Sequence, residues 1–267
     1  AVFMQGDREA AARQLKDIET QGLPMRLKGR LALVQALLDD HDMVSKQKHL
    51  ATAIAAMPGT LIEESALRRS ALAFADAHDE RLFWERVARY QRRFPNSLYA
   101  PAFWQDVSHA VIAWPAKESG FDLERLNMTW RDLEPAQRRS LYLGLTRQAA
   151  AANNRRVMEF AAAKLRGLSP EGGTEDQAAK LYLSLYEIAS AEGDDALRAL
   201  KSLRLDLLGP QERQLLNAAL AVSEQINRPL PAAWSAPGVE EAQEDALQIR
   251  GQKALDDSGK ILAGLSP

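Results

Sequence analysis

The sequence predicts an all-α fold that is built from repeated helical hairpins, and three observations support this. Ala, Leu, Arg, Gln and Glu dominate the 267 residues, and these residues favour helices. No segment shows the two-residue alternation of apolar and polar side chains that a half-buried strand requires. A small or polar pair recurs before a helical segment at regular intervals, which indicates an internal repeat.

The recurring pair defines the period of this repeat. It occurs at five places: Gly6-Asp7, His41-Asp42, His78-Asp79, Asn153-Asn154 and Gly193-Asp194. The second members are 35, 37, 75 and 40 residues apart. Because 75 is about two periods, a sixth turn is expected near Ser119-Gly120-Phe121-Asp122. Six turns at this spacing predict a tetratricopeptide-like α-solenoid of about six irregular helical hairpins.

Each period has room for two helices of about 15 residues, and the polar member of the pair caps the second helix. Apolar residues at helical spacing predict the buried stripes, and such narrow stripes require each hairpin to stack on its neighbours. The three clearest stripes are Leu27, Leu31, Val34 and Leu38; Phe83, Val87, Tyr90 and Phe94; and Leu215, Ala219, Val222 and Ile226.

Local signals mark several helix boundaries. Pro58-Gly59 ends one helix, and Thr60 with Glu63 forms a capping box for the next. Thr174 and Gln177 are expected to form a second capping box. Pro210 suits the first position of a helix because that position needs no amide donor.

The predicted repeat domain covers residues 1–228. Three prolines stiffen residues 229–238, which are interpreted as a linker. Residues 239–267 are expected to form a polar C-terminal helix and a tail. The chain opens like the last turn of a helix before Gly6, so we expect the natural protein to begin upstream, where a targeting segment would lie.

Bulk composition excludes several function classes. A net charge of −2 gives no long-range attraction to nucleic acid. The apolar runs are far shorter than the roughly 20 residues that span a bilayer, so no transmembrane segment is predicted. The chain contains no cysteine, which rules out disulfides and thiol catalysis within it.

No catalytic, cofactor-binding or metal-ligating motif stands out. Adjacent carboxylates such as Glu63-Glu64 and Asp194-Asp195 point about 100° apart on a helix, so they are interpreted as caps and solvated faces. The histidines His41, His49, His78 and His109 lack metal-ligand spacing. The sequence therefore predicts a binding protein and not an enzyme.

Two groups of residues are candidates for contact with a protein partner. One helical face carries Arg86, Arg89 and Arg93 beside Trp84 and Tyr90, which would suit an acidic peptide or a nucleic acid. The balancing acidic residues of the chain favour the peptide. Trp104 and Trp114 would line an aromatic groove for an extended peptide. The favoured interpretation of the tryptophans is that they fill the middle of the solenoid.

Two phrases in the sequence stand out: residues 58–70, PGTLIEESALRRS, and residues 90–100, YQRRFPNSLYA. Both resemble the MotC family of periplasmic motility proteins, and the second is similar to the R-R-F-x-x-S-x-Y-A segment of that family. Residues 138–143, RRSLYL, fit the same pattern. The likeness follows the order of elements over residues 1–228.

This resemblance implies a protein that is exported to the periplasm and is not an enzyme. It also implies a chaperone-like role toward the periplasmic part of the flagellar stator protein MotB. Two alternatives stay open from the residues: a tetratricopeptide-type scaffold for cell-envelope assembly, and the helical accessory region of a peptidoglycan lytic enzyme.

Overall fold

The computed structural model describes residues 22–39, 42–114, 121–187 and 193–226, with single positions at 10, 14, 15, 18 and 253. The described residues form eleven α-helices and a short 3-10 helix, and they contain no strand. The α-helices are α2 (Met25–Leu38), α3 (Met43–Ala56), α4 (Leu61–Asp76), α5 (Glu80–Arg93), α6 (Ala100–Ala113), α7 (Leu123–Trp130), α8 (Pro135–Ala151), α9 (Arg155–Leu168), α10 (Thr174–Glu187), α11 (Gly193–Lys201) and α12 (Pro210–Ile226). The 3-10 helix η2 (Leu205–Leu207) precedes α12. The predicted all-α class is confirmed.

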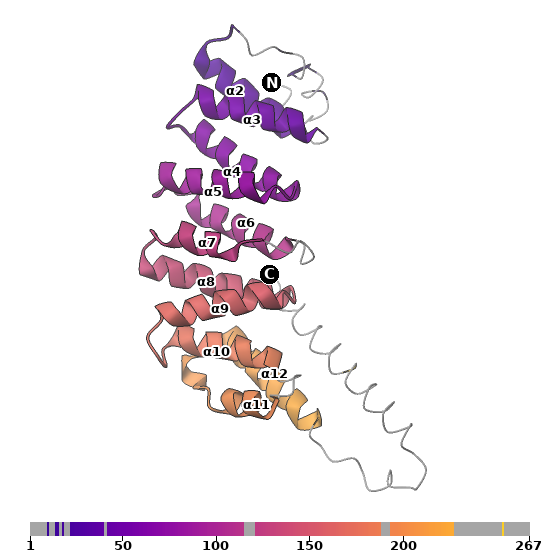
Figure 1. Ribbon diagram of the computed structural model, residues 1–267, viewed down its shortest axis with the longest axis vertical. Helices are drawn as coiled ribbons and strands as arrows, with labels where there is room; N and C mark the ends of the chain where they lie inside the picture. Colours follow the sequence, from indigo (N-terminus) through magenta and orange to yellow (C-terminus); the bar gives the residue numbers. More distant parts are fainter. Residues whose placement is uncertain are drawn as a thin grey trace, which may run out of the picture. The chain divides into compact units, whose positions relative to one another are not determined.

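The helices alternate between two roles within each repeat. We call α2, α4, α6, α8, α10 and α12 the A helices, and α3, α5, α7, α9 and α11 the B helices. The A helices begin 35 to 39 residues apart, which matches the predicted period. In four repeats the A helix packs against the B helix that follows it: α2 with α3, α4 with α5, α8 with α9, and α10 with α11 (Figure 1).

The chain divides into two compact units, residues 1–132 and 133–267. Unit 1 holds α2 to α7, and unit 2 holds α8 to α12. The predicted linker at 229–238 and the predicted helix from 239 onward lie outside the described ranges, so those two domain assignments stay predictions.

Polar caps start the B helices as predicted. The side chains of four residues each accept a hydrogen bond from a backbone amide of the first turn, which would otherwise lack an acceptor. These residues are Asp42, Asp79, Asp122 and Asn154. Asp122 lies in the segment where the sixth turn is expected. The fifth predicted turn differs, because α11 already begins at Gly193 and Asp194 therefore lies inside the helix.

Two A-to-B turns share one backbone geometry. His78 and Asn153 adopt φ values of 54° and 53°. The amide after each donates to the carbonyl five residues earlier, from Asp79 to Phe74 at 2.9 Å and from Asn154 to Ala149 at 2.8 Å. This left-handed closure satisfies the last carbonyls of the A helix and directs the chain into the B helix. His78 thus has a backbone role at the turn.

The α2 stripe predicted from sequence is displaced. Leu27 is 54% exposed, and Leu31, Val34 and Leu38 are only half-buried. The buried side of α2 instead includes three small residues that allow close helix packing, Gly29, Ala32 and Ala36, together with Leu33 and Gln35. The second capping box is also wrong, because α10 begins at Thr174 and the Gln177 side chain accepts from the Arg204 amide at 3.0 Å.

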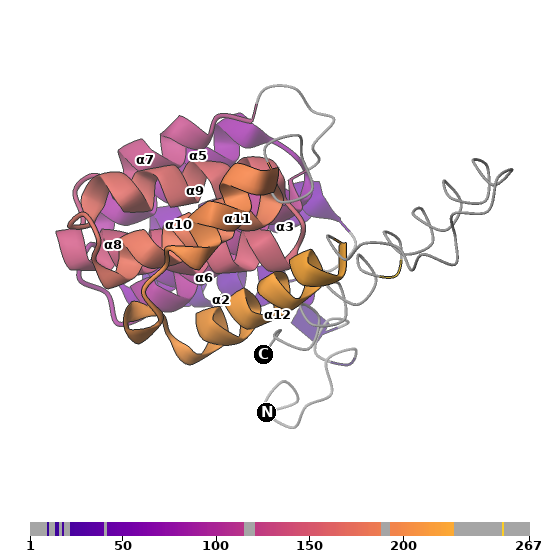
Figure 2. The same cartoon turned by 90° about the horizontal axis from the view of Figure 1, so that it is seen from below.

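Both units bury alanines that let the helix backbones approach, such as Ala66 and Ala71 in unit 1 and Ala161 and Ala179 in unit 2. Large, fully enclosed side chains fill the space between the helices. They include the rings of Phe83, Tyr90, Phe103 and Trp130 in unit 1, and Tyr142, Met158 and Leu165 in unit 2. In unit 2, α10 contacts both α11 and α12, and Figure 2 shows these three helices side by side. None of the described helices is both long and apolar enough to cross a membrane.

Replacing His78 or Asn153 with valine should lower the free energy of unfolding by about 1–2 kcal/mol, because a β-branched residue is strained at positive φ. Valine at the preceding residues, Ala77 and Ala152, should change it by less than about 0.5 kcal/mol, because these exposed residues have negative φ. Urea unfolding followed by circular dichroism measures both. Equal losses at the two kinds of site would contradict the proposed role of the left-handed turn.

Candidate functional site

Trp84 and Trp114 belong to an aromatic cluster in the core of unit 1 with the buried rings of Phe83 and Phe121, and the exposed His78 lies at the edge of this cluster. The Trp114 ring lies 4.5 Å from Phe121 and 5.8 Å from Phe83, measured between centroids. Trp84 lies 4.7 Å from Phe83, and His78 lies 5.6 Å from Trp114. Both tryptophans are more than nine-tenths buried. The interpretation that they fill the solenoid therefore agrees with their position.

Trp104 belongs to a second aromatic group in the same unit. Its ring is 5.3 Å from Phe103 and 6.0 Å from Tyr90, and it meets Trp130 edge-on at 6.4 Å. Tilted and edge-on contacts of this kind favour a fixed arrangement of the rings. Contact of Trp84, Trp104 or Trp114 with a partner stays a prediction about a complex; in the free chain all three rings are packed inside unit 1.

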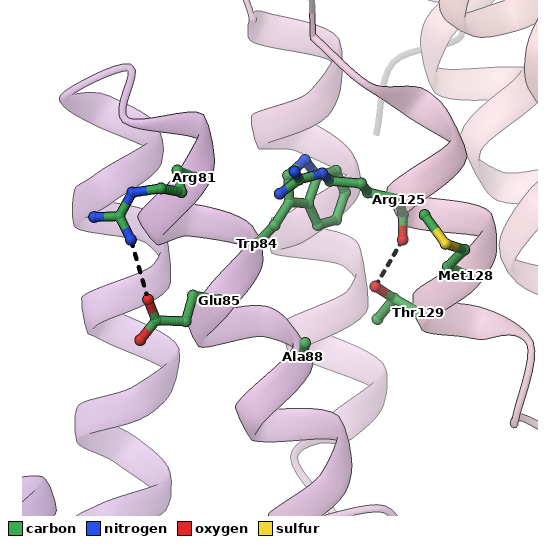
Figure 3. A pocket seen from close by; sticks show the side chains of 7 residues that line it. All are labelled: Arg81, Trp84, Glu85, Ala88, Arg125, Met128 and Thr129. Atoms are coloured by element: carbon green, nitrogen blue, oxygen red, sulfur yellow. Dashed lines mark hydrogen bonds and ion pairs between the residues drawn. The ribbon is translucent and has the colours of Figure 1, made fainter.

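A groove of about 380 Å³ opens between α5 and α7 over the edge of Trp84. Figure 3 shows the Arg81–Glu85 ion pair on the α5 side and Arg125 with Met128 on the α7 side. Arg125 lies 3.6 Å from Asp122. The charged groups of the groove are therefore already paired, and the groove is small for a folded partner.

The three candidate arginines on α5 separate into two sets. Arg89 and Arg93 reach the Glu63 carboxylate of α4, at 3.3 and 2.8 Å. Arg86 instead contacts Glu85 at 2.7 Å and the Ser70 hydroxyl at 3.3 Å. All three arginines therefore face α4, and only Arg89 and Arg93 share one carboxylate.

A buried polar cluster joins α4 to α5, and Glu63 lies at its centre. We call this cluster the latch; it consists of Gly59, Glu63, Glu64, Arg89, Tyr90, Arg93 and Ser97. The side chain of Glu63 is fully buried, and it also accepts the Gly59 amide at 2.6 Å. Gly59 can point its amide at this carboxylate because it adopts φ of +74°, a conformation that glycine tolerates. Thr60 caps the same helix by accepting from the Ile62 amide. The carboxylate therefore bonds the residue before the cap and not the cap itself, which differs from the predicted box.

Glu64 forms the second half of the latch. This carboxylate is 3% exposed, and it accepts from the Tyr90 hydroxyl at 3.0 Å and from the Ser97 hydroxyl. Ser97 lies in the loop between α5 and α6, so Glu64 holds both the end of α5 and the loop that follows. The prediction of a solvated face is wrong for Glu64, because the start of α4 is covered by α5 and this loop. The divergence of about 100° between Glu63 and Glu64 instead lets each reach a different set of donors.

The latch changes the acidity of its members. Burial alone raises the pKa of the Glu63 carboxyl, but hydrogen bonds from Arg93, the Gly59 amide and Arg89 together hold this pKa below its ordinary value. Burial raises the pKa of the Tyr90 phenol to about 12, and the adjacent Glu64 charge acts in the same direction. Glu63 is therefore an ionised structural acceptor at neutral pH, and Tyr90 is a donor.

The same device recurs at the third position of two other A helices. Asp176 of α10, 3% exposed, accepts the Gly172 amide at 2.9 Å and pairs with Arg166 of α9 at 3.2 Å and with Lys180 at 2.7 Å. Glu212 of α12, 1% exposed, pairs with Arg147 of α8 at 2.7 Å. Both Gly59 and Gly172 have positive φ. A carboxylate here also benefits from the positive end of the helix dipole.

The other sequence candidates do not assemble into a reactive site in the described part of the chain. His109 is exposed on α6, His49 is half-buried on α3, and His41 lies outside the described residues. Among the described residues no three His, Cys, Asp or Glu side chains gather in a way that could hold a metal ion. The buried carboxylates Glu63, Glu64 and Asp176 are each occupied by donors of neighbouring helices or loops.

Comparison with known proteins identifies the group to which this arrangement belongs. The family model described as "Chemotaxis protein MotC" matches residues 1–260. The chain belongs to the MotC family. A chemotaxis protein MotC from Rhizobium meliloti (strain 1021) is 30% identical over 236 residues, which cover 86% of this chain and 52% of that protein. The chain thus spans about half the length of this MotC relative. No solved structure was found to match the chain.

The two phrases that resemble MotC proteins in sequence are the two sides of the unit 1 latch. Residues 58–70 supply Gly59, Glu63 and Glu64, and residues 90–100 supply Tyr90, Arg93 and Ser97. Sequence reasoning found both phrases but missed that they bind each other. One sequence feature could have indicated this contact: an acidic pair in the first turn of one helix, followed by an arginine pair in the last turn of the next helix.

Replacing Glu63 with glutamine, Asp176 with asparagine or Glu212 with glutamine should each lower the free energy of unfolding by about 2–3 kcal/mol, because charge-assisted hydrogen bonds in a buried site are lost. Glu159→Gln is the matched control. Its exposed pair with Arg155 lies within one helix and should be worth less than about 0.5 kcal/mol. Denaturant titration measures the free energy of unfolding of all four variants. If Glu159→Gln lowers it as much as the three latch variants do, the stabilising role of the buried carboxylates is refuted.

The latch should also make the protein acid-sensitive. The pKa values of Glu63 and Asp176 are both lowered on folding, so their contribution is complete above the ordinary carboxyl range and is lost as pH falls through the folded values. Thermal unfolding between pH 6 and pH 3 should show a steep decline in the natural chain. The double variant with Glu63→Gln and Asp176→Asn should show a shallower decline of the unfolding temperature with falling pH. If the two proteins decline in parallel, these carboxylates are not the source of the acid sensitivity.

Proposed function

We propose that this chain is the helical-repeat part of a non-enzymatic periplasmic scaffold that binds the flagellar stator protein MotB and supports motility. Membership in the MotC family carries the proposal. The curated relative is named a chemotaxis protein, and the resemblance noted in the sequence implies the periplasmic part of MotB as the partner.

The architecture suits the binding of a partner, and the described residues do not assemble into a catalytic site. Helical repeats present long rows of side chains on fixed helices, which is how solenoids contact extended partners. The strongest polar clusters, at Glu63, Asp176 and Glu212, connect helices to each other. Their buried carboxylates therefore stabilise the scaffold and are not positioned toward a substrate.

The purified chain should retain the periplasmic region of MotB in a pull-down, with no change in the mass of either protein after incubation. A periplasmic protein of similar size and net charge serves as the control and should be washed away. Isothermal titration should give one saturable binding event. Absence of MotB retention at micromolar concentrations would refute the proposed partner, and cleavage of either protein would refute the non-enzymatic role.

A cellular test addresses motility itself. Cells that lack the gene should lose most of their spreading in soft agar, and a copy with the latch-breaking Glu63→Gln and Asp176→Asn changes should restore less spreading than the natural copy, because it folds less stably. The Glu159→Gln copy should restore it fully. Normal spreading without the gene would contradict a role in motility.

A further inference from the structure

One end of unit 1 combines exposed apolar side chains with positive charge. We call it the basic end and define it as residues 25–28, 57–64 and 89–101 together with Arg68. At this end the A helices begin and the B helices finish. Gly29 lies against Met57 with no room for a Cβ, and Glu63 bonds Arg93. The starts of α2 and α4 and the end of α5 therefore belong to one end of the unit.

Five large apolar side chains of the basic end are open to solvent. They are Met25 at 58% exposure, Leu27 at 54%, Leu61 at 66%, Leu98 at 95% and Tyr99 at 48%. Single exposed apolar residues are ordinary, but a group at one place marks an interaction surface. The group spans the first turns of α2 and α4 and the loop between α5 and α6.

The charge of the basic end has one sign at its surface. It contains six cations: Arg26, Lys28, Arg68, Arg89, Arg92 and Arg93. Its two carboxylates, Glu63 and Glu64, are buried and already bonded. By contrast, the opposite end of unit 1 begins its B helices with carboxylate caps, Asp42, Asp79 and Asp122. Unit 1 is therefore polarised, with positive charge around its exposed apolar side chains.

The loop that presents Leu98 is held by the buried latch. Ser97 donates to Glu64, the Tyr99 amide donates to the Ser97 hydroxyl at 3.0 Å, and the Ala100 amide donates to the Ser97 carbonyl at 3.1 Å. The Arg68 guanidinium lies over the Tyr99 ring at 4.9 Å. A loop held in this way loses little backbone freedom when a partner covers Leu98, which favours binding.

We propose that the basic end is a docking surface for an acidic protein segment that carries apolar side chains, with Leu98 as the central anchor. Five of its six cations are arginines, which recognise carboxylates in a two-pronged geometry. Arginine, tyrosine and methionine are enriched in protein interfaces, whereas lysine is depleted. This composition favours a protein over a lipid surface. The proposal rests on the proposed protein-binding function and names the surface that performs it.

The test compares two variants of the full chain with two matched controls. Leu98→Ser removes the anchor, and Arg26→Glu with Arg92→Glu reverses charge without touching the latch. Val44→Ser and Lys48→Glu make the same kinds of change on α3, outside the basic end; Val44 is 81% exposed. The probes are the MotB periplasmic region, a synthetic peptide of glutamates interleaved with leucine and phenylalanine, and vesicles of anionic or neutral phospholipid.

The MotB region should bind the two basic-end variants about tenfold more weakly than the controls, and its binding to the natural chain should weaken with salt. If MotB binds all four variants alike, the docking surface is refuted and the proposed function stands. If MotB does not bind at all, the proposed function fails, and the acidic peptide decides: binding that is lost in the basic-end variants supports the surface, and no binding overturns it. Retention by anionic vesicles alone, lost in the same variants, would overturn the proposal in favour of a membrane surface.

Discussion

The carboxylate at the third position of an A helix is the interaction on which the arrangement of these repeats depends. Apolar stripes can slide or rotate relative to one another, because dispersion and the hydrophobic effect are nearly non-directional. A buried carboxylate with several donors at fixed angles is directional and fixes both helices. Glu63 joins α4 to α5, Asp176 joins α10 to α9, and Glu212 joins α12 to α8. The latches at Glu63 and Asp176 also accept the backbone amides of Gly59 and Gly172, which precede the two helices.

The latch also gives a physical meaning to the MotC resemblance. Neither phrase is informative by itself, since an acidic first turn and an arginine-rich last turn are common helix features. In the structure Glu63 and Glu64 use both features at once, because one carboxylate takes the arginines and the other takes Tyr90 and Ser97. The two MotC-like phrases therefore follow each other in the sequence because they lie on two consecutive helices, α4 and α5, that bind each other.

Sequence reasoning succeeded where the cause is local. The caps Asp42, Asp79, Asp122 and Asn154 follow from the needs of a helix start, and the repeat period follows from their spacing. It failed where the cause lies in another helix. The burial of Glu64 depends on Tyr90 and Ser97, about thirty residues away, and the inward side of α2 is set by how closely Gly29 meets Met57. No pattern within a single helix carries that information.

The pairing of each helix with its neighbours in the chain has a consequence for how the protein reaches its folded state. Contacts in α2–α3, α4–α5 and α8–α9 join residues that are close along the sequence, so little loop entropy is lost when each hairpin closes. Such a chain can fold one hairpin at a time from its N-terminus, before its C-terminal part is available for contacts. The latches at Glu63 and Asp176, which join consecutive helices, would then make those steps harder to reverse.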